Sequence, residues 1–251
     1  MYIYAESFAH FRGAIESLPV GQKLQKSDLL TDRFRLYEDD RLAIFYVPFD
    51  YVKPEARLTL IGITPGWTQM ELAFRTAGQG LRAGHTAEQV FFEVDRTASF
   101  AGSMRTNLIN MLDELGIGSA LGLRTSEQLF AGHSVLVHTT SAVRYATFIK
   151  RGGRMYNYTG YSPKVLQHAR LKGYVENLLT DELERAAESL IVPLGKSVSE
   201  VLEFLVQKGH VDPDRCLLEF PHPSGANGHR KLQFREGKER MASIVNKWFG
   251  G

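Results

Sequence analysis

The residue best placed for chemistry is a histidine held between two prolines. His222 lies between Pro221 and Pro223, directly after the apolar segment 216–220. Proline fixes its own φ angle and restricts the residue before it, so the backbone here is held and the imidazole is aimed. Such a ring can donate a hydrogen bond to negative charge that develops on a leaving group. The alternative is a buried histidine or a turn residue with a purely structural role.

A second candidate is the turn that follows another apolar segment. Residues 57–63 form a compact apolar run that ends in Thr64-Pro65-Gly66. Pro65 fixes φ and Gly66 permits a positive φ, so we expect a buried strand leading into a rigid loop with one hydroxyl, that of Thr64. The Gly-x-x-x-x-Gly-Lys-Ser/Thr spacing of a phosphate loop is absent. An ordinary structural turn is the alternative.

Positive charge is concentrated in residues 144–172, although the net charge of the chain is only +2. This segment has seven Lys or Arg residues and no Asp or Glu, and tyrosines are interleaved with the cations. The cations are Arg144, Lys150, Arg151, Arg154, Lys164, Arg170 and Lys172. Such a segment suits a polyanion whose bases can stack, and the small and then basic residues 225–231 suit close approach to a phosphate backbone. A solvated basic loop without a ligand is the alternative.

Other kinds of site find no support in the sequence. Cys216 is the single cysteine, which excludes a disulfide or an iron–sulfur cluster held by several thiolates within the chain. His133 and His138 are expected on opposite faces of one strand. There is no His-Glu-x-x-His and no Gly-x-Ser-x-Gly. We therefore predict no metal site and no cofactor. Residues 1–6 do not resemble a signal peptide and no apolar run is long enough to span a bilayer, so we expect a cytoplasmic protein.

Apolar periodicity predicts the elements that position these residues. Helices are expected over 6–18, over 71–95 with a break at 78–80, over 103–115, over 198–207 with a capping box from Ser197 and Glu200, and over 236–249. Short strands are expected within 35–47, and buried strands over 57–63, 134–138, 190–194 and 216–220.

Four apolar strands separated by helices predict an α/β fold. We expect three α/β/α layers around a central, mostly parallel four-stranded sheet, in one domain over 1–251 with residues 1–50 packed on it. Ligands of such folds bind beyond the carboxyl ends of the strands. Three candidate segments fall there, namely 64–66, 139–141 and 222–224. Their convergence predicts a site that no single motif would establish.

The ordered motifs resemble those of the uracil-DNA glycosylase superfamily. Gly62-Ile63-Thr64-Pro65-Gly66 resembles its first motif, especially the Gly-x-Asn-Pro-Gly form, and His222-Pro223-Ser224 matches its His-Pro-Ser motif. Between them, residues 100–103, 137–144 and 191–195 are similar to further family segments. The resemblance spans about residues 55 to 245 in the family's order, with the helical segment 67–99 as an insertion.

The resemblance implies an enzyme that extrudes a base from DNA and cleaves its N-glycosidic bond. It implies that His222 faces the base oxygen that gains charge and that Ile63 and Thr64 hold the attacking water. The implied base-binding residues are Phe100, which stacks on the base, Ser141, Thr140, Gly62, Pro65 and Gly66. The implied DNA-binding residues are Ser224, Gly225, Asn227, Arg230, Arg144 and Arg154.

Two departures from the family pattern keep the alternatives open. Thr64 stands where more active branches have Asp or Asn, and a hydroxyl is no general base near neutral pH. Ser141 stands where a base-reading Asn is common, and a hydroxyl makes fewer specific bonds. We therefore predict a DNA glycosylase of altered base specificity. The alternatives are a non-catalytic nucleic-acid-binding protein and an enzyme acting on a nucleoside-like small ligand.

Overall fold

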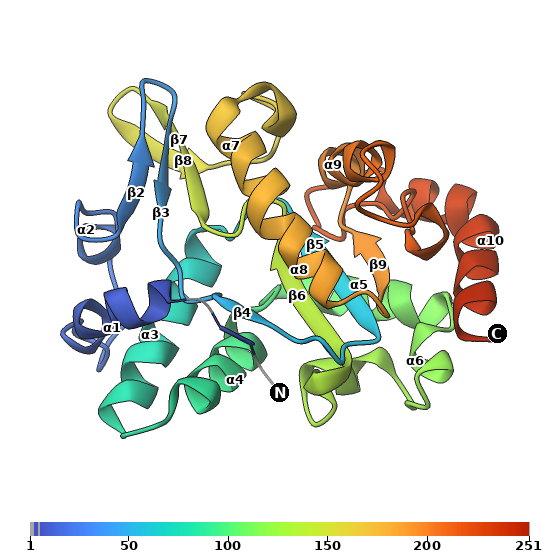
Figure 1. Ribbon diagram of the computed structural model, residues 1–251, viewed down its shortest axis with the longest axis horizontal. Coiled ribbons are helices and arrows are strands. Elements are labelled where there is room, and N and C mark those ends of the chain that lie inside the picture. The colour runs from blue at the N-terminus through green and yellow to red at the C-terminus, as the bar shows by residue number, and fades with distance from the viewer. Residues whose placement is uncertain (1–2, 5, 251) are drawn as a thin grey trace.

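The computed structural model describes residues 3–4 and 6–250 (Figure 1), so positions 1, 2, 5 and 251 of the predicted domain, and with them part of the N-terminal segment 1–6, lie outside the described residues. The first part of the chain contains β1 (Ile3–Tyr4), α1 (Ser7–Glu16), α2 (Lys26–Leu29), β2 (Arg35–Glu38), β3 (Leu42–Phe45) and β4 (Tyr51–Val52). The middle contains β5 (Leu58–Gly62), α3 (Trp67–Arg82), α4 (Ala87–Ala98), α5 (Ser103–Glu114), α6 (Ile117–Ala120), β6 (Val137–Ser141), β7 (Ala146–Arg151) and β8 (Arg154–Asn157). The last part contains α7 (Ala169–Tyr174), α8 (Thr180–Arg185), β9 (Leu190–Pro193), α9 (Lys196–Gln207) and α10 (Arg230–Phe249).

The described strands form three separate sheets. Strands β6, β5 and β9 make a parallel sheet in that order, with Gly62 opposite Ser141. Strands β2, β3, β7 and β8 make an antiparallel sheet whose hairpins project at the upper left of Figure 1. Strands β1 and β4 form a short antiparallel pair. The fold is therefore α/β as predicted, with a mixed strand arrangement.

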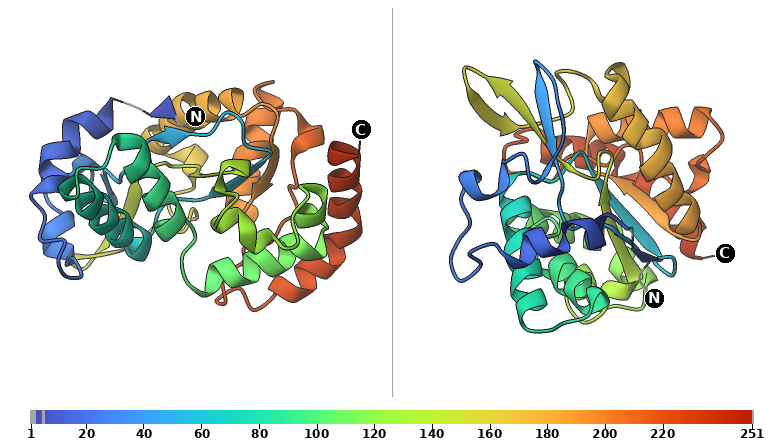
Figure 2. Two further views of the ribbon diagram at one scale, coloured as in Figure 1. Left: turned by 90° about the horizontal axis from the view of Figure 1, so that it is seen from below. Right: turned by 60° about the vertical axis from the view of Figure 1, so that its left-hand side comes forward.

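The parallel sheet is buried on both faces. Leu58 and Leu60 of β5 pack into an apolar cluster with α5, α6 and α10, whereas Ile61 packs into a second cluster with α8 and α9. This follows from the two-residue period of a strand, which sends successive side chains to opposite faces. Helices thus cover both faces of the parallel sheet (Figure 2).

The prediction that residues 216–220 form a fourth strand of the central sheet is wrong. Cys216 makes a single parallel bridge with Ile191, after which the chain turns and the Phe220 N–H donates to the Leu217 carbonyl. An apolar run alone does not separate a buried strand from a buried turn. The parallel sheet of the described chain therefore has three strands rather than four.

Several element boundaries also differ from prediction. The second buried strand begins at Val137 rather than at 134, because a short 3₁₀ turn (Ser134–Leu136) precedes it. Helix α10 begins at Arg230 rather than at 236. The predicted capping box of α9 is absent: Gly195 is the N-cap residue, and no side chain caps this end. The other predicted helices and strands lie close to their predicted ranges, whereas elements such as β7, β8, α7 and α8 were not predicted.

The inserted segment 67–99 is helical, but its break lies elsewhere than expected. Helix α3 continues through residues 78–80, where a Cβ on Gly78 would lie 2.6 Å from Cγ1 of Val20. Glycine there permits close packing of α3 on the N-terminal segment. The chain breaks after Arg82 instead, and Thr86 caps α4 by accepting the Gln89 N–H.

The hydroxyl of Thr64 joins the parallel sheet to the antiparallel sheet. It donates to the Tyr145 carbonyl at 2.7 Å and accepts the Thr147 amide N–H at 3.1 Å. The turn after β5 is thereby fixed to the start of β7. Both bonds are buried, so a backbone group deprived of its partner here would lie away from water.

Replacing this hydroxyl with a methyl group tests the junction. Thr64→Val leaves the buried Thr147 N–H without its acceptor, so we expect the free energy of unfolding to fall by about 1–3 kcal/mol. Denaturant unfolding measures the change. Thr106→Val, at an exposed position of α5, is the matched control and should change stability by less than about 0.5 kcal/mol. Equal stability of the two variants would contradict the junction.

Candidate functional site

An open groove of about 1030 Å³ lies beyond the carboxyl end of β5. It is lined by the turn after β5, the end of β6, the loop after β8, the start of α9 and the loop around His222. Predicted site residues that line it are Gly62, Ile63, Thr64, Gly66, Phe100, Ser141, His222, Ser224 and Asn227. The predicted convergence of these segments is therefore present in the structure.

Two hydrogen bonds fix the loop around His222, and burial favours the neutral form of its ring. The Ser224 amide N–H donates to Nδ1 at 3.2 Å, and the Asn227 side-chain amide donates to the His222 carbonyl at 3.2 Å. Burial lowers the pKa of His222 below its ordinary value of 6.5. Because Nδ1 accepts a hydrogen bond, the proton of the neutral ring is assigned to Nε2. The ring therefore carries one N–H donor within a residue that lines the groove.

Phe100 also lines the groove and is held in an uncommon conformation. Its φ angle is +49°, a region that residues other than glycine rarely occupy, and its side chain is buried. A Cβ on Gly62 would lie 3.3 Å from Cε1 of Phe100, so the ring lies directly over this glycine. Arg105 fixes the preceding backbone by donating to the Ser99 carbonyl.

Strand β6 sorts its polar side chains onto two faces. His138 and Thr140 both hydrogen-bond Glu182, which comes from α8. Thr139 lies on the other face with Ser99, and Ser141 lies near Gly62, with its Oγ 3.6 Å from the position of a Cβ there. The hydroxyl of Thr140, predicted to bind the base, is engaged with Glu182, although Thr140 lines a small cavity together with Ser141 and Phe100.

Thr64 and Ile63 line the groove, but the Thr64 hydroxyl and the Ile63 carbonyl already make backbone hydrogen bonds. Both hydrogen-bonding directions of the Thr64 hydroxyl serve the backbone of residues 145 and 147, and the Ile63 carbonyl accepts the Val143 N–H at 3.0 Å. The prediction that the Thr64 hydroxyl orients the attacking water does not fit this geometry. Its role in the structure is to join two sheets.

Gly66 provides close packing and not the positive φ that was expected. Its φ angle is −83°, not positive. A Cβ there would lie 3.1 Å from Nδ2 of Asn157, whose Oδ1 accepts the Trp67 N–H at 3.0 Å and so caps α3. No local pattern in the sequence points to Asn157, because it lies 90 residues from the helix that it caps.

A buried carboxylate behind Phe100 was also missed. Asp95 of α4 accepts Lys53 Nζ at 2.5 Å, the Tyr51 hydroxyl at 2.6 Å and the Thr139 hydroxyl at 2.7 Å. Burial opposes ionisation of Asp95, but the charge of Lys53 and the hydrogen bonds outweigh it and lower the pKa. Ser99 also donates to this carboxylate, at 2.9 Å. The partners come from distant parts of the sequence, so spacing could not reveal the group.

A small cavity of about 20 Å³ lies beside this carboxylate cluster. It is lined by Pro65, Ser99, Phe100, Thr139 and Ser141, with further residues around them. Its volume is enough for about one water molecule. Pro65, predicted to bind the base, thus contributes to this cavity and not to the open groove.

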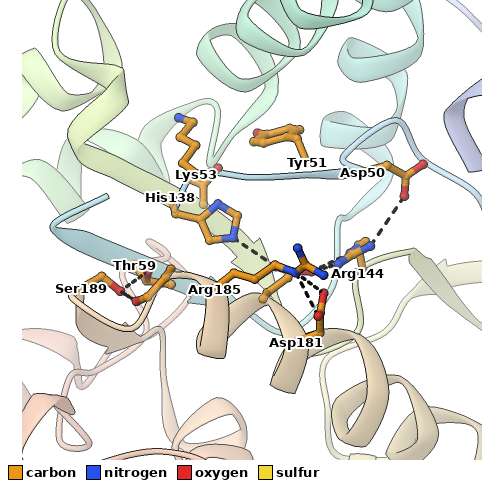
Figure 3. A network of polar contacts seen from close by, with 12 residues as sticks. Asp50, Tyr51, Lys53, Thr59, His138, Arg144, Asp181, Arg185 and Ser189 are labelled. Carbon is orange, nitrogen blue, oxygen red and sulfur yellow. Dashed lines mark hydrogen bonds and ion pairs between the residues drawn. The ribbon is translucent and has the colours of Figure 1, made fainter. Parts of the chain in front are cut away.

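Arg144 is not available to DNA, contrary to prediction. Its guanidinium is 7 % exposed and donates to Glu182 through Nε at 2.6 Å. Asp50 lies 3.9 Å away on the other side (Figure 3). Burial of Glu182 opposes its ionisation, yet the charge of Arg144 and the hydrogen bonds from His138 and Thr140 lower its pKa. Arg144 is thus the counter-charge of a buried acidic cluster.

The other predicted DNA-binding residues divide into two kinds. Arg230 donates to the Ser224 carbonyl at 2.7 Å and to the Pro223 carbonyl, and so fixes the His222 loop from α10. Gly225 and Arg154 are exposed. Elsewhere in the basic segment 144–172, Lys150, Lys164 and Lys172 pair with nearby glutamates. Much of that positive charge is therefore neutralised within the protein.

The described chain has neither a candidate metal cluster nor a candidate membrane span. Residues 3–4 and 6–250 contain no group of three or more His, Cys, Asp or Glu side chains that could hold a metal ion. Within the same residues, no helix combines the length and the apolar character needed to cross a membrane.

Comparison with known proteins identifies one relative by sequence. No family model matches the chain. The chain is 40% identical over 250 residues to the uncharacterized protein YoxB of Bacillus subtilis (strain 168), covering 99% of this chain and 95% of that protein. The chain belongs to the same family as YoxB. The YoxB family therefore extends over nearly the whole of both chains, including the groove and the buried clusters described above.

A solved structure also aligns with the chain. The crystal structure of wild-type Pedobacter heparinus SMUG2 covers 78% of this chain and 77% of that chain, with 13% identity and a TM-score of 0.45. A likeness of this degree assigns no residue a role. The resemblance of the motifs to the uracil-DNA glycosylase superfamily stays a prediction, as do the roles it implies.

The acidic cluster around Arg144 makes stability depend on pH. Burial raises the pKa of Asp50 from 3.8 to about 6, so folding favours its protonated form. The stabilisation that the protonated Asp50 gives to the folded state is fully present below pH 3.8 and is lost as the pH rises through about 6. The free energy of unfolding is expected to fall by about 3 kcal/mol over this interval. We expect the native protein to lose stability relative to Asp50→Asn over this interval. Denaturant unfolding of both proteins at a series of pH values measures it.

Tyr145 and Arg144 both contact Asp50, so Asp50→Asn could also change stability through these contacts. A second variant separates that effect from the loss of the titrating group. Tyr145→Phe removes the 3.0 Å hydrogen bond to Asp50 but keeps the carboxyl group. It should keep the pH dependence that Asp50→Asn loses. A stability difference between the native protein and Asp50→Asn that is constant with pH would contradict the assignment.

Proposed function

We propose that this protein is a DNA glycosylase-type hydrolase that releases a damaged or mismatched base by cleaving its N-glycosidic bond. The observation that carries the proposal is the state of His222. It is a neutral imidazole whose Nδ1 accepts the Ser224 N–H, so that Nε2 is left as a donor in a groove that also contains Phe100 and Ser141. A donor, an aromatic ring and a small polar side chain suit an extruded base.

The proposed reaction depends on stabilisation of the leaving group, which is the base. As the bond between the sugar C1′ and the base nitrogen breaks, its electron pair goes to the base and the sugar becomes oxocarbenium-like. Water then adds to C1′, and the proton that it loses is taken up by the base. A hydrogen bond from Nε2 of His222 to the base oxygen stabilises the negative charge at the moment it develops. The ring does not need to be charged to do this.

The turn after β5 supports the activation of water less well than the His222 loop supports stabilisation of the leaving base. The Thr64 hydroxyl and the Ile63 carbonyl are both engaged in backbone hydrogen bonds. The proposed enzyme therefore depends on leaving-group stabilisation and releases bases slowly, since no side chain in this turn can accept a proton from water near neutral pH.

Ser141 supports a broad choice of base. A hydroxyl offers one donor and two acceptor positions and can rotate between them, whereas an amide presents its donor and acceptor in fixed positions. A site that leaves fewer buried polar groups unpaired with the wrong base also discriminates less strongly. We therefore propose a preference for bases that leave readily or pair poorly, and not for uracil alone.

Base release from defined oligonucleotides tests the proposal. Single- and double-stranded oligonucleotides carrying uracil, hypoxanthine, xanthine or mismatched bases are incubated with the native protein and with His222→Ala, and abasic sites are scored. We expect release from at least one substrate, reduced on the order of 100-fold in His222→Ala because one donor to the developing anion is removed. His229→Ala, an exposed histidine of the same loop, should retain native activity.

Two outcomes would contradict this proposal: no abasic product on any oligonucleotide, or equal product from the native protein and His222→Ala. If DNA binds without release, the protein is a non-catalytic nucleic-acid-binding protein. Release from free nucleosides but not from oligonucleotides would instead indicate an enzyme for a small ligand.

The protonation state of His222 gives a separate prediction. Its pKa is lowered from 6.5 by burial, so the neutral ring is the main form above pH 6.5. We expect the rate of base release under single-turnover conditions to show no titration of His222 in that range. An inflection above pH 6.5 that disappears in His222→Ala would show that the charged ring is the active form.

A further inference from the structure

A second groove, of about 480 Å³, lies between α5 and α10, outside the site described above. Asn107, Asn110 and Glu114 of α5 line it together with Lys231, Arg235 and Lys238 of α10. The ion pair between Lys238 and Glu114, at 2.9 Å, joins the two helices, which lie next to each other in Figure 2. Nothing in the mechanism proposed for His222 uses this groove.

The cations of α10 are gathered on the side that faces this groove. Lys231, Arg235 and Lys238 are spaced four and then three residues apart, which places them on one face of a helix. Glu236 falls on a different face by the same periodicity, whereas Glu239, four residues after Arg235, lies next to Arg235 on the helix surface. Like charges at this spacing repel one another, so their arrangement costs stability unless an anion lies near them.

The charge of the groove is only partly neutralised. Glu114 pairs with Lys238. Lys231 and Arg235 are exposed, and within residues 6–250 neither has an ion pair or a side-chain hydrogen bond. The groove therefore offers two unpaired cations, with the amides of Asn107 and Asn110 along its other wall.

Hydrogen bonds connect this groove to the His222 loop. The side-chain amide of Asn107 donates to the Pro223 carbonyl at 2.9 Å. Arg230, the first residue of α10, donates to Asn107 Oδ1 at 3.3 Å and to the Ser224 carbonyl at 2.7 Å. One end of the groove is thus continuous with the wall of the candidate site.

We propose that the groove between α5 and α10 binds the sugar–phosphate backbone of the DNA strand next to the extruded nucleotide. Phosphates are the anions that a row of exposed Lys and Arg side chains attracts without sequence preference, and asparagine amides can donate to their oxygens. The proposal rests on the function proposed above, because that function supplies DNA as the ligand. It assigns a binding role to Lys231, the last residue of the basic segment 225–231, and to Arg235, which the sequence motifs did not indicate.

The salt dependence of DNA binding tests this role. A labelled single-stranded oligonucleotide and a duplex, both without a releasable base, are titrated with the native protein and with Lys231→Ala/Arg235→Ala at several salt concentrations. We expect the affinity of the double variant to fall on the order of tenfold at low salt. The slope of log affinity against log salt should decrease by roughly 0.7 to 0.9 for each phosphate that the variant no longer neutralises.

Arg240→Ala/Lys247→Ala is the matched control, because it removes the same charge from the same helix. These side chains pair with Glu219 and Asp214 away from the groove, and both pairs are exposed. The control should bind DNA with native affinity and salt slope. Circular dichroism and thermal unfolding check that both double variants fold as the native protein does.

Each result has a separate meaning for the two proposals. Equal affinity and slope in the two double variants, with DNA bound by the native protein, overturns the groove and leaves base release to its own assay. Loss of affinity in Lys231→Ala/Arg235→Ala supports the groove even if no base is released. Tighter binding of an RNA strand of the same sequence overturns the assignment to DNA. No binding of DNA by the native protein overturns both proposals.

Discussion

The buried ion pair between Lys53 and Asp95 is the interaction on which the candidate site depends. An isolated carboxylate in this position would be strongly disfavoured, so α4 can deliver Asp95 to the interior only if the segment after β4 delivers Lys53 to the same point. The same carboxylate accepts the hydroxyls of Ser99 and Thr139. Because Ser99 directly precedes Phe100, compensation of one buried charge also fixes the aromatic side of the groove.

Hydroxyl and guanidinium groups near the ends of the parallel strands have two different roles: some hydrogen-bond other parts of the protein and some face the groove. The sequence alone does not distinguish the two roles. Ser141 lies at the groove, whereas Thr64 and Thr140, which are close to it along the chain or across the sheet, hydrogen-bond other parts of the protein. Arg144 likewise neutralises Glu182 and not a ligand. The polar residues of the region therefore divide between holding the layers together and facing the open groove.

Local periodicity predicted much of the fold, since β5, β9 and α5 are defined by apolar patterns within a few residues. It also predicted that Gly62 and Ser141 would converge, because carboxyl ends of parallel strands share one edge. His222 lines the same groove although the segment before it is not a strand of the parallel sheet. The segment 216–220 failed because an apolar run does not distinguish a strand from a turn. The roles of Asp95 and Asn157 could not be predicted, since each depends on partners more than 40 residues away.

The two glycines beneath the site residues have a consequence for selectivity. Gly62 leaves 3.3 Å between a notional Cβ and the Phe100 ring, and a Cβ on Gly195 would lie 2.8 Å from that of His222. Both side chains thus rest on main chain, which cannot rotate aside as a side chain can. In the proposed function, this fixed backing would select ligands by thickness and width more than by the pattern of their hydrogen-bonding edges.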